Sequence, residues 1–225
     1  MNILAVDTSS SACVLGVRTS DQTWTDEAIV DRSHSKEVLP RIEALLQRAG
    51  VDKSSLNLIV YGQGPGSFTG LRIGVGVVQG LAYGLGIPVV GVSSLACLAQ
   101  KQLRLGNGSH GLVALTARYT EVYFGAYEAQ DGIMQLLGHE GVFEAAEIPT
   151  QTAAETWIGV GSGWNLAETL TAAAGIKVDH IFLEEYPEAT DLLDLGEAGY
   201  NAGAAKTAPE ALPEYLREQV AAKPT

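Results

Sequence analysis

Apolar runs alternate with polar turns from the first residues of the chain. Ile3 to Val6 is apolar and ends at Asp7, hydroxyl residues follow, and Ala12 to Val17 is apolar again. This pattern predicts a strand, a turn and a second strand, with a third strand around Thr23 to Ile29. Residues 35–49 then carry apolar side chains at helical spacing and are followed by a glycine, which predicts an amphipathic helix.

The following residues continue the alternation of strands and helices. The predicted elements are a strand over 58–61, a glycine-rich helix over 69–85, a strand over 89–92 and a helix over 94–103. Strands that alternate with helices favour a sheet with a parallel component.

The second half of the chain repeats the plan of the first. Residues 105–111 are glycine-rich and polar, which predicts a boundary between a first lobe, 1–104, and a second lobe, 105–225, with a flexible tail. Residues 112–115 and 122–127 again read as strand, turn and strand, and they are followed by a strand over 157–160, a helix over 165–174 and a short segment over 214–220. The predicted fold is therefore α/β with two lobes, each a mixed sheet with helices.

Glycines recur at every fourth position of the predicted helix 69–85. Gly76, Gly80 and Gly84 then share one face, and each costs about 1 kcal/mol of helix stability relative to alanine. Close approach of another backbone would compensate for this cost, and the approaching surface could be a second subunit, the chain's own sheet or a ligand. A subunit interface is our prediction, formed by these glycines and their apolar neighbours Leu45, Leu71, Val77 and Leu81.

Composition narrows the classes of function. The 225 residues are 46% hydrophobic and 18% charged, which is typical of a folded globular protein, and the formal net charge is −12. An acidic chain repels the phosphates of nucleic acid, so we expect any RNA to be bound mainly by another protein. The N-terminus lacks an export signal and no apolar run is long enough to cross a membrane, which predicts a cytoplasmic protein. Cys13 and Cys97 lie in apolar surroundings and are predicted to be buried thiols.

Several strings of residues resemble a known family. Two α/β halves that open with hydroxyl-tipped hairpins are similar to the superfamily of actin, sugar kinases and heat-shock ATPases. Within it the chain resembles the TsaB (YeaZ) family almost from end to end. The strings that carry the resemblance are ILAVDTSSSACVLGV, HSKEVLP, YGQGPGSFTGLRIGVGVVQGLA, IPVVGVSSL, WIGVGSGW and PEYLREQV.

The resemblance implies a role in tRNA modification without catalysis. TsaB-like proteins pair with the related TsaD protein, which transfers a threonylcarbamoyl group to an adenine beside the anticodon of tRNAs that read codons beginning with A. The expected role is scaffold and activator in a complex with TsaD and a TsaE-type ATPase. Pairing would use helices 35–49 and 69–85, with homodimers when the partner is absent and tRNA reached only through the complex. The chain is expected to need no cofactor of its own, with ATP or ADP at the interface with the partner.

Comparison with the superfamily pattern also argues against ATP binding and hydrolysis by this chain. Actin-like ATPases use a carboxylate at the end of the first strand of each half to hold metal and phosphates. Asp7 occupies the first place, whereas Thr116 stands where many relatives have aspartate and Thr120 replaces a usual glycine. The alternatives for Asp7 are a remnant nucleotide pocket and a cap on its own turn. The candidate pocket residues are Asp7, Ser9, Gly161 and Gly163.

Stand-alone enzymes are the alternative class of function. The catalytic relative needs paired metal-binding histidines, whereas His34, His110, His139 and His180 are widely separated, so no metal site is predicted. A serine hydrolase would need Ser67 or Ser162 to meet a histidine and a carboxylate, although neither serine lies in a Gly-x-Ser-x-Gly motif. A small-molecule kinase would need larger halves than this chain provides.

Overall fold

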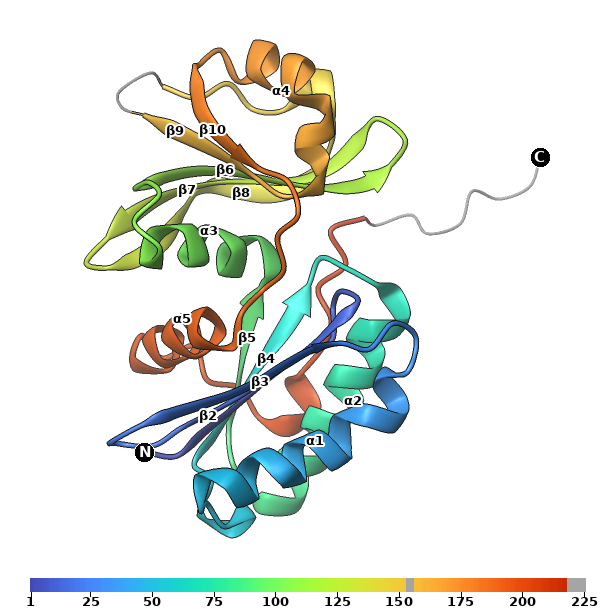
Figure 1. Ribbon diagram of the computed structural model, residues 1–225, viewed down its shortest axis with the longest axis vertical. Helices are drawn as coiled ribbons and strands as arrows, with labels where there is room; N and C mark the ends of the chain where they lie inside the picture. The colour runs from blue at the N-terminus through green and yellow to red at the C-terminus, as the bar shows by residue number, and fades with distance from the viewer. Residues whose placement is uncertain (153–155, 218–225) are drawn as a thin grey trace, which may run out of the picture. The chain divides into compact units, whose positions relative to one another are not determined.

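The chain forms two compact units, which are described separately. A computed structural model describes residues 1–152 and 156–217 (Figure 1). The first unit contains residues 1–101 and 186–213, and the second contains 102–185 and the residues from 214. The predicted flexible tail and the end of the predicted segment 214–220 lie outside the described residues.

The first unit is built on a five-stranded mixed sheet in the order β3-β2-β1-β4-β5. Strands β1, β2 and β3 are antiparallel, whereas β4 and β5 run parallel to β1. The predicted strand, turn and strand over residues 3–17 are confirmed, and β3 has the predicted bounds. The strands are β1 (Ile3–Asp7), β2 (Ala12–Arg18), β3 (Thr23–Ile29), β4 (Leu58–Gly64) and β5 (Val89–Ser93).

Helices cover both faces of this sheet, as Figure 1 shows. Helices α1 (His34–Ala49) and α2 (Phe68–Leu85) pack on one face, where apolar residues of β1, β2 and β4 meet theirs in a core. Helix α3 (Ser94–Arg104) follows β5, and a short 3-10 turn, η1 (Lys53–Ser55), precedes β4. The predicted helices 35–49, 69–85 and 94–103 are thus confirmed to within a residue at each end.

Helix α5 (Ala189–Asn201) covers the other face of the first sheet, although it follows the second sheet in sequence. Its Leu192 and Leu193 join a core with strands β1, β4 and β5, and a Cβ on Gly196 would lie 2.3 Å from Val60. Residues 186–213 therefore differ from the prediction, which placed them in the second lobe. Long-range burial of apolar surface returns this segment to the first unit.

The second unit repeats the sheet of the first, in the order β10-β9-β6-β7-β8. Strand β6 is antiparallel to β7 and parallel to β9, as β1 is to β2 and β4. Helix α4 (Ala167–Ala174) and the 3-10 turns η2 (Ala145–Glu147) and η3 (Ser162–Leu166) complete the unit. The predicted fold class, two mixed sheets with helices, is confirmed. The strands are β6 (His110–Arg118), β7 (Glu121–Gln130), β8 (Ile133–Glu144), β9 (Trp157–Val160) and β10 (Val178–Phe182).

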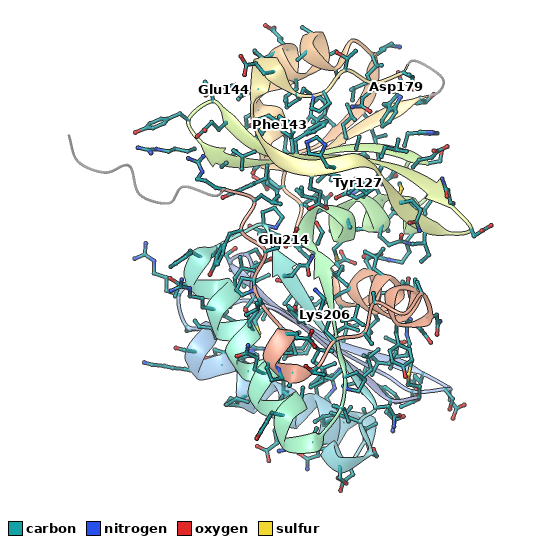
Figure 2. The ribbon with its side chains drawn as sticks, turned by 180° about the vertical axis from the view of Figure 1, so that it is seen from behind. Tyr127, Phe143, Glu144, Asp179, Lys206 and Glu214 are labelled. Atoms are coloured by element: carbon teal, nitrogen blue, oxygen red, sulfur yellow. The ribbon has the colours of Figure 1, made fainter. Side chains whose placement is uncertain are left out.

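A C-terminal segment, residues 206–212, is tied back onto the first unit. Lys206, labelled in Figure 2, forms a two-bond bridge with Val89 of β5. The Gln79 amide donates to the Ala211 carbonyl at 2.7 Å, and the Leu212 amide donates to the Tyr61 hydroxyl at 3.1 Å. The segment includes the 3-10 turn η4 (Ala208–Glu210). Among the described helices, none has the length and apolar character needed to cross a membrane.

Candidate functional site: the open face of helix α2

Helix α2 begins and ends at well-defined caps. The Ser67 hydroxyl accepts a hydrogen bond from the Gly70 amide at 3.3 Å, which satisfies one of the free N–H groups of the first turn. Gly86 closes the helix in the left-handed region, at a φ of 67°. The glycines of α2, together with Gly66 just before its N-cap, form two sets with different surroundings.

The first set of glycines, which we call the inner glycines, holds the tip of the β1–β2 hairpin. A Cβ would lie 2.3 Å from the Ser9 carbonyl at Gly66, 2.0 Å from the Thr8 carbonyl at Gly70, and 2.4 Å from the Thr8 hydroxyl at Gly74. The Thr8 hydroxyl also donates to the Gly70 carbonyl at 2.8 Å. Close packing on the chain's own fold therefore explains this set.

The second set, which we call the outer glycines, consists of Gly76, Gly80 and Gly84. Apart from the adjacent backbone of α2 itself, no heavy atom of the described residues lies within 4 Å of the point where a Cβ would stand on any of them. Packing against the chain's own sheet, one of the three predicted alternatives, does not account for this set. The outer glycines leave bare backbone along an open face of α2.

The apolar residues predicted to share this face divide into two groups. Val77 and Leu81 are half-buried and pack partly against the core. Leu45 is 0% exposed and Leu71 3% exposed, so both belong to the interior of the first unit and do not form part of an accessible surface. The prediction grouped Leu71 of α2 and Leu45 of α1 with the glycines as part of a two-helix interface, but local spacing could not show which residues the sheet covers.

A shallow hollow borders the outer glycines on the side of the C-terminal segment. Its volume is about 480 Å³, and its floor includes Gly76 and Gly80. Tyr83, with 79% of its surface exposed, and Pro209 of η4 form its edges. A larger hollow of about 660 Å³ continues past Tyr83 along the same segment. The sequence did not predict this hollow, because Ala208 and Pro209 lie more than a hundred positions after the glycines that they face.

The candidate nucleotide residues are engaged in packing. Asp7 is 1% exposed, and its Oδ1 accepts from the Ser9 amide at 2.6 Å, which is the predicted cap on its own turn. Its Oδ2 has no hydrogen-bond partner among the described residues and faces Gly62, where a Cβ would lie 1.9 Å away. Burial raises the pKa of this carboxyl group. An enclosed carboxyl group of this kind does not fit a ligand for a metal-bound nucleotide.

Gly161 and Gly163 lie in the second unit, whereas Asp7 and Ser9 lie in the first. A Cβ on Gly161 would lie 2.6 Å from the Ala114 carbonyl oxygen, and one on Gly163 would lie 2.9 Å from Ala114. Gly161 also has a φ of 100°, a conformation that favours glycine. Close approach to strand β6 accounts for both glycines without a ligand.

The residues considered for hydrolysis have structural partners. The Ser67 hydroxyl caps α2, and the Ser162 hydroxyl accepts from the Thr116 amide at 3.1 Å. Ser67 and His34 do line one cavity, but no hydrogen bond joins them, and His34 Nε2 instead lies 3.3 Å from the Ala12 carbonyl oxygen. Within the described ranges no group of three or more potential metal ligands occurs.

Comparison with known proteins gives consistent similarities over the whole chain. A family model described as TsaD, tRNA N6-adenosine threonylcarbamoyltransferase, matches residues 27–225. The tRNA threonylcarbamoyladenosine biosynthesis protein TsaB of Escherichia coli is 33% identical over 99% of this chain and 97% of its own length. The TsaB protein of Haemophilus influenzae is 30% identical over 98% of this chain and 95% of its own.

A solved structure extends the similarity to three dimensions. The structure of YeaZ from Pseudomonas aeruginosa is 37% identical and superimposes with a TM-score of 0.89, covering 96% of this chain and 99% of that chain. A similarity of this extent includes both sheets and the helices that cover them.

Proposed function

Because this chain belongs to the TsaB (YeaZ) family of tRNA threonylcarbamoyladenosine biosynthesis proteins, we propose that it is the non-catalytic partner and activator of a TsaD-type transferase. Pairing uses the open face of helix α2, together with helix α1. The proposed partner is a paralogue with the same ancestry, since the TsaD family model matches 27–225 of this chain.

The observation that supports the pairing is the bare backbone of the outer glycines. Each glycine weakens an isolated helix by about 1 kcal/mol relative to alanine, and the inner glycines offset this cost through contacts with the hairpin tip. The outer glycines have no such contact in the described chain. A partner helix can approach this face more closely than a face lined with side chains, and the exposed ring of Tyr83 adds apolar contact area beside it.

Membership of the TsaB family also supports a proposal for the larger complex in which this chain acts. The cytoplasmic complex contains a TsaE-type ATPase, and this chain forms homodimers through the same face when the paralogue is absent. Any ATP or ADP is held at the interface with the partner, because Asp7 is enclosed within this chain. The net charge of −12 supports tRNA binding by the partner and not by this chain alone.

The test is to replace Gly80 with leucine and measure binding to the TsaD-type paralogue by calorimetry. The isobutyl group would stand where the partner backbone approaches, so the affinity should fall about tenfold or more. Recovery of threonylcarbamoyladenosine in tRNA by the reconstituted complex should fall in parallel.

The control places the same side chain, leucine, on a helix that does not belong to the proposed face. Ala172 of α4 is exposed and lies in the second unit, so Ala172→Leu should leave the affinity unchanged. Circular dichroism and thermal unfolding establish that both variants remain folded. Unchanged affinity in a folded Gly80→Leu variant would remove this face from the interface.

A further inference from the structure

A second cavity of the first unit lies beside the beginnings of helices α1 and α2. Its volume is about 730 Å³, within the range of pockets that hold small molecules. Three segments that are distant in sequence line it: the tip of the β1–β2 hairpin, the loop that leads into α1, and the first turn of α2. The polar lining residues include Ser10, Ser11, Arg32, His34, Ser67 and Thr69.

Two helix N-termini contribute partial positive charge to this cavity. Helix α1 begins at His34 and helix α2 at Phe68, and they contain sixteen and eighteen residues. In Figure 1 both helices begin at the same end of the first unit. The Ser33 hydroxyl donates to the Val30 carbonyl at 2.7 Å and does not cap α1. The Lys36 amide donates to the Ser33 carbonyl at 2.9 Å, so the amides that this end of α1 can offer to a ligand are those of His34 and Ser35. Aligned peptide dipoles at such ends favour a negatively charged ligand.

Arg32 is an unusual arginine in this chain. It lines the cavity and has no ion pair, hydrogen bond or ring contact among the described residues. The other seven arginines each have a partner, for example Arg18 with Asp194 and Arg41 with Asp26. An unpaired guanidinium that lines a polar cavity can donate two parallel hydrogen bonds to the oxygens of one phosphate group.

His34 supplies an independent indication of a ligand. Its side chain is 94% buried, since 6% of the residue is exposed, and the ring lines the cavity. Nε2 lies 3.3 Å from the Ala12 carbonyl oxygen, an acceptor, so Nε2 carries a proton. No hydrogen bond to Nδ1 occurs in the described part of the chain. Nδ1 is not one of the enclosed polar atoms without a partner in the described residues, so it is accessible from the cavity, where a hydroxyl of the ligand can donate to it.

From these observations we propose that this cavity binds the phosphate group of a small phosphorylated molecule. Arg32 and the first-turn amides of α2 bind the phosphate oxygens, the serine hydroxyls donate further bonds, and His34 Nδ1 accepts from a ligand hydroxyl. Asp31 also lines the cavity and opposes the anion, which makes it a useful probe of the proposal. The cavity has room for more than a phosphate ion. This site does not depend on the proposed pairing, because it is formed by one unit of one chain.

The experiment is a titration of the purified full chain with inorganic phosphate and, separately, with adenosine monophosphate at constant ionic strength. Amide chemical shifts of Phe68, Thr69 and the residues around His34 should move and saturate, with a dissociation constant of about 1 mM or tighter. Tighter binding of the nucleotide assigns the cavity to a phosphorylated small molecule, and equal binding assigns it to free phosphate. Both outcomes support a phosphate site, whereas shifts that do not saturate would overturn it.

Charge variants distinguish a specific phosphate site from non-specific electrostatic attraction of the anion to the protein. Arg32→Gln should weaken binding about tenfold, and Asp31→Asn should strengthen it, because the two changes alter the charge of the cavity in opposite directions. Arg48→Gln is the control, since Arg48 lies in the last turn of α1 and its replacement removes the same charge elsewhere. Equal weakening by Arg32→Gln and Arg48→Gln would contradict the site. Arg32 and Asp31 are exposed, so these variants should fold normally.

Discussion

The two sets of glycines on and just before helix α2 have the same four-residue spacing but opposite surroundings. Gly66, Gly70 and Gly74 lie against the hairpin tip, where added methyl groups would meet atoms of Thr8 and Ser9 at less than 3 Å. Gly76, Gly80 and Gly84 face open space. Spacing in the sequence therefore shows which glycines recur together. The residues packed against each set decide whether those glycines stabilise the fold or leave a surface for a partner.

The largest effect on stability should come from adding a methyl group to an inner glycine, where the hairpin tip leaves no space for it. In Gly70→Ala the new methyl group would stand 2.0 Å from the Thr8 carbonyl oxygen, a backbone atom that cannot move without displacing the hairpin. The free energy of unfolding should fall by about 3 kcal/mol or more. Urea unfolding of the purified chain measures this loss.

Gly76→Ala is the matched control, because it is the same change on the same helix with nothing within 4 Å. It should keep or slightly raise the stability of the chain. Equal stability of the two variants would mean that the inner glycines are not required for packing against the hairpin.

A smaller effect should come from the charge enclosed beside the inner face. Burial raises the pKa of Asp7 above its ordinary value of 3.8, so the folded state holds this proton more tightly than the unfolded chain. The stability of the wild-type protein should fall as the pH rises from 3.8 through the folded-state pKa. The loss is about 1.4 kcal/mol for every tenfold difference in proton affinity between the folded and unfolded states. Asp7→Asn removes this penalty and keeps an oxygen for the Ser9 amide.

Urea unfolding at a series of pH values tests the Asp7 prediction. The stability of Asp7→Asn relative to wild type should increase with pH across this window and then level off. A difference that does not change with pH would show that Asp7 has no raised pKa in the folded protein.

The smallest effect on folding should come from the outer face. Gly80→Ala adds a methyl group in open space and removes backbone freedom from the unfolded chain, so the isolated protein should gain about 1 kcal/mol. The same methyl group should weaken pairing with the TsaD-type paralogue. Thermal unfolding and calorimetric titration of one sample measure both changes. A variant that pairs as well as wild type would place the partner backbone elsewhere.

Local patterns predicted most of the first unit because its elements are strongly periodic. Strand β3 was predicted with the observed bounds and helix α1 to within one residue. Strand β8 and helix α5 were not predicted. Strand β8 is an edge strand with many exposed residues, so its alternation is weak. The place of α5 depends on Val60 and other residues far away in sequence, which no local pattern reveals.

The candidate site was predicted only in outline. The outer glycines are visible in the sequence because they repeat at helical spacing, whereas Leu45 and Leu71 were placed near them and are buried in the core. His34 and Ser67 attracted notice separately, yet nothing in the sequence indicated that they line one cavity with Arg32. Convergence of residues from three loops depends on the register of the sheet and not on their spacing.

The order of residues is sufficient to establish the family, the repeated strand plan and the presence of glycine on one helix face, because each depends on neighbours a few positions apart. The three-dimensional arrangement decides which face of α2 is covered and which stays open. Residues 8 and 9 contact the inner glycines, and residues 208 and 209 line the hollow beside the outer ones. Both contacts join segments that are distant along the chain, so only the folded protein separates the glycines that pack from those left for a partner.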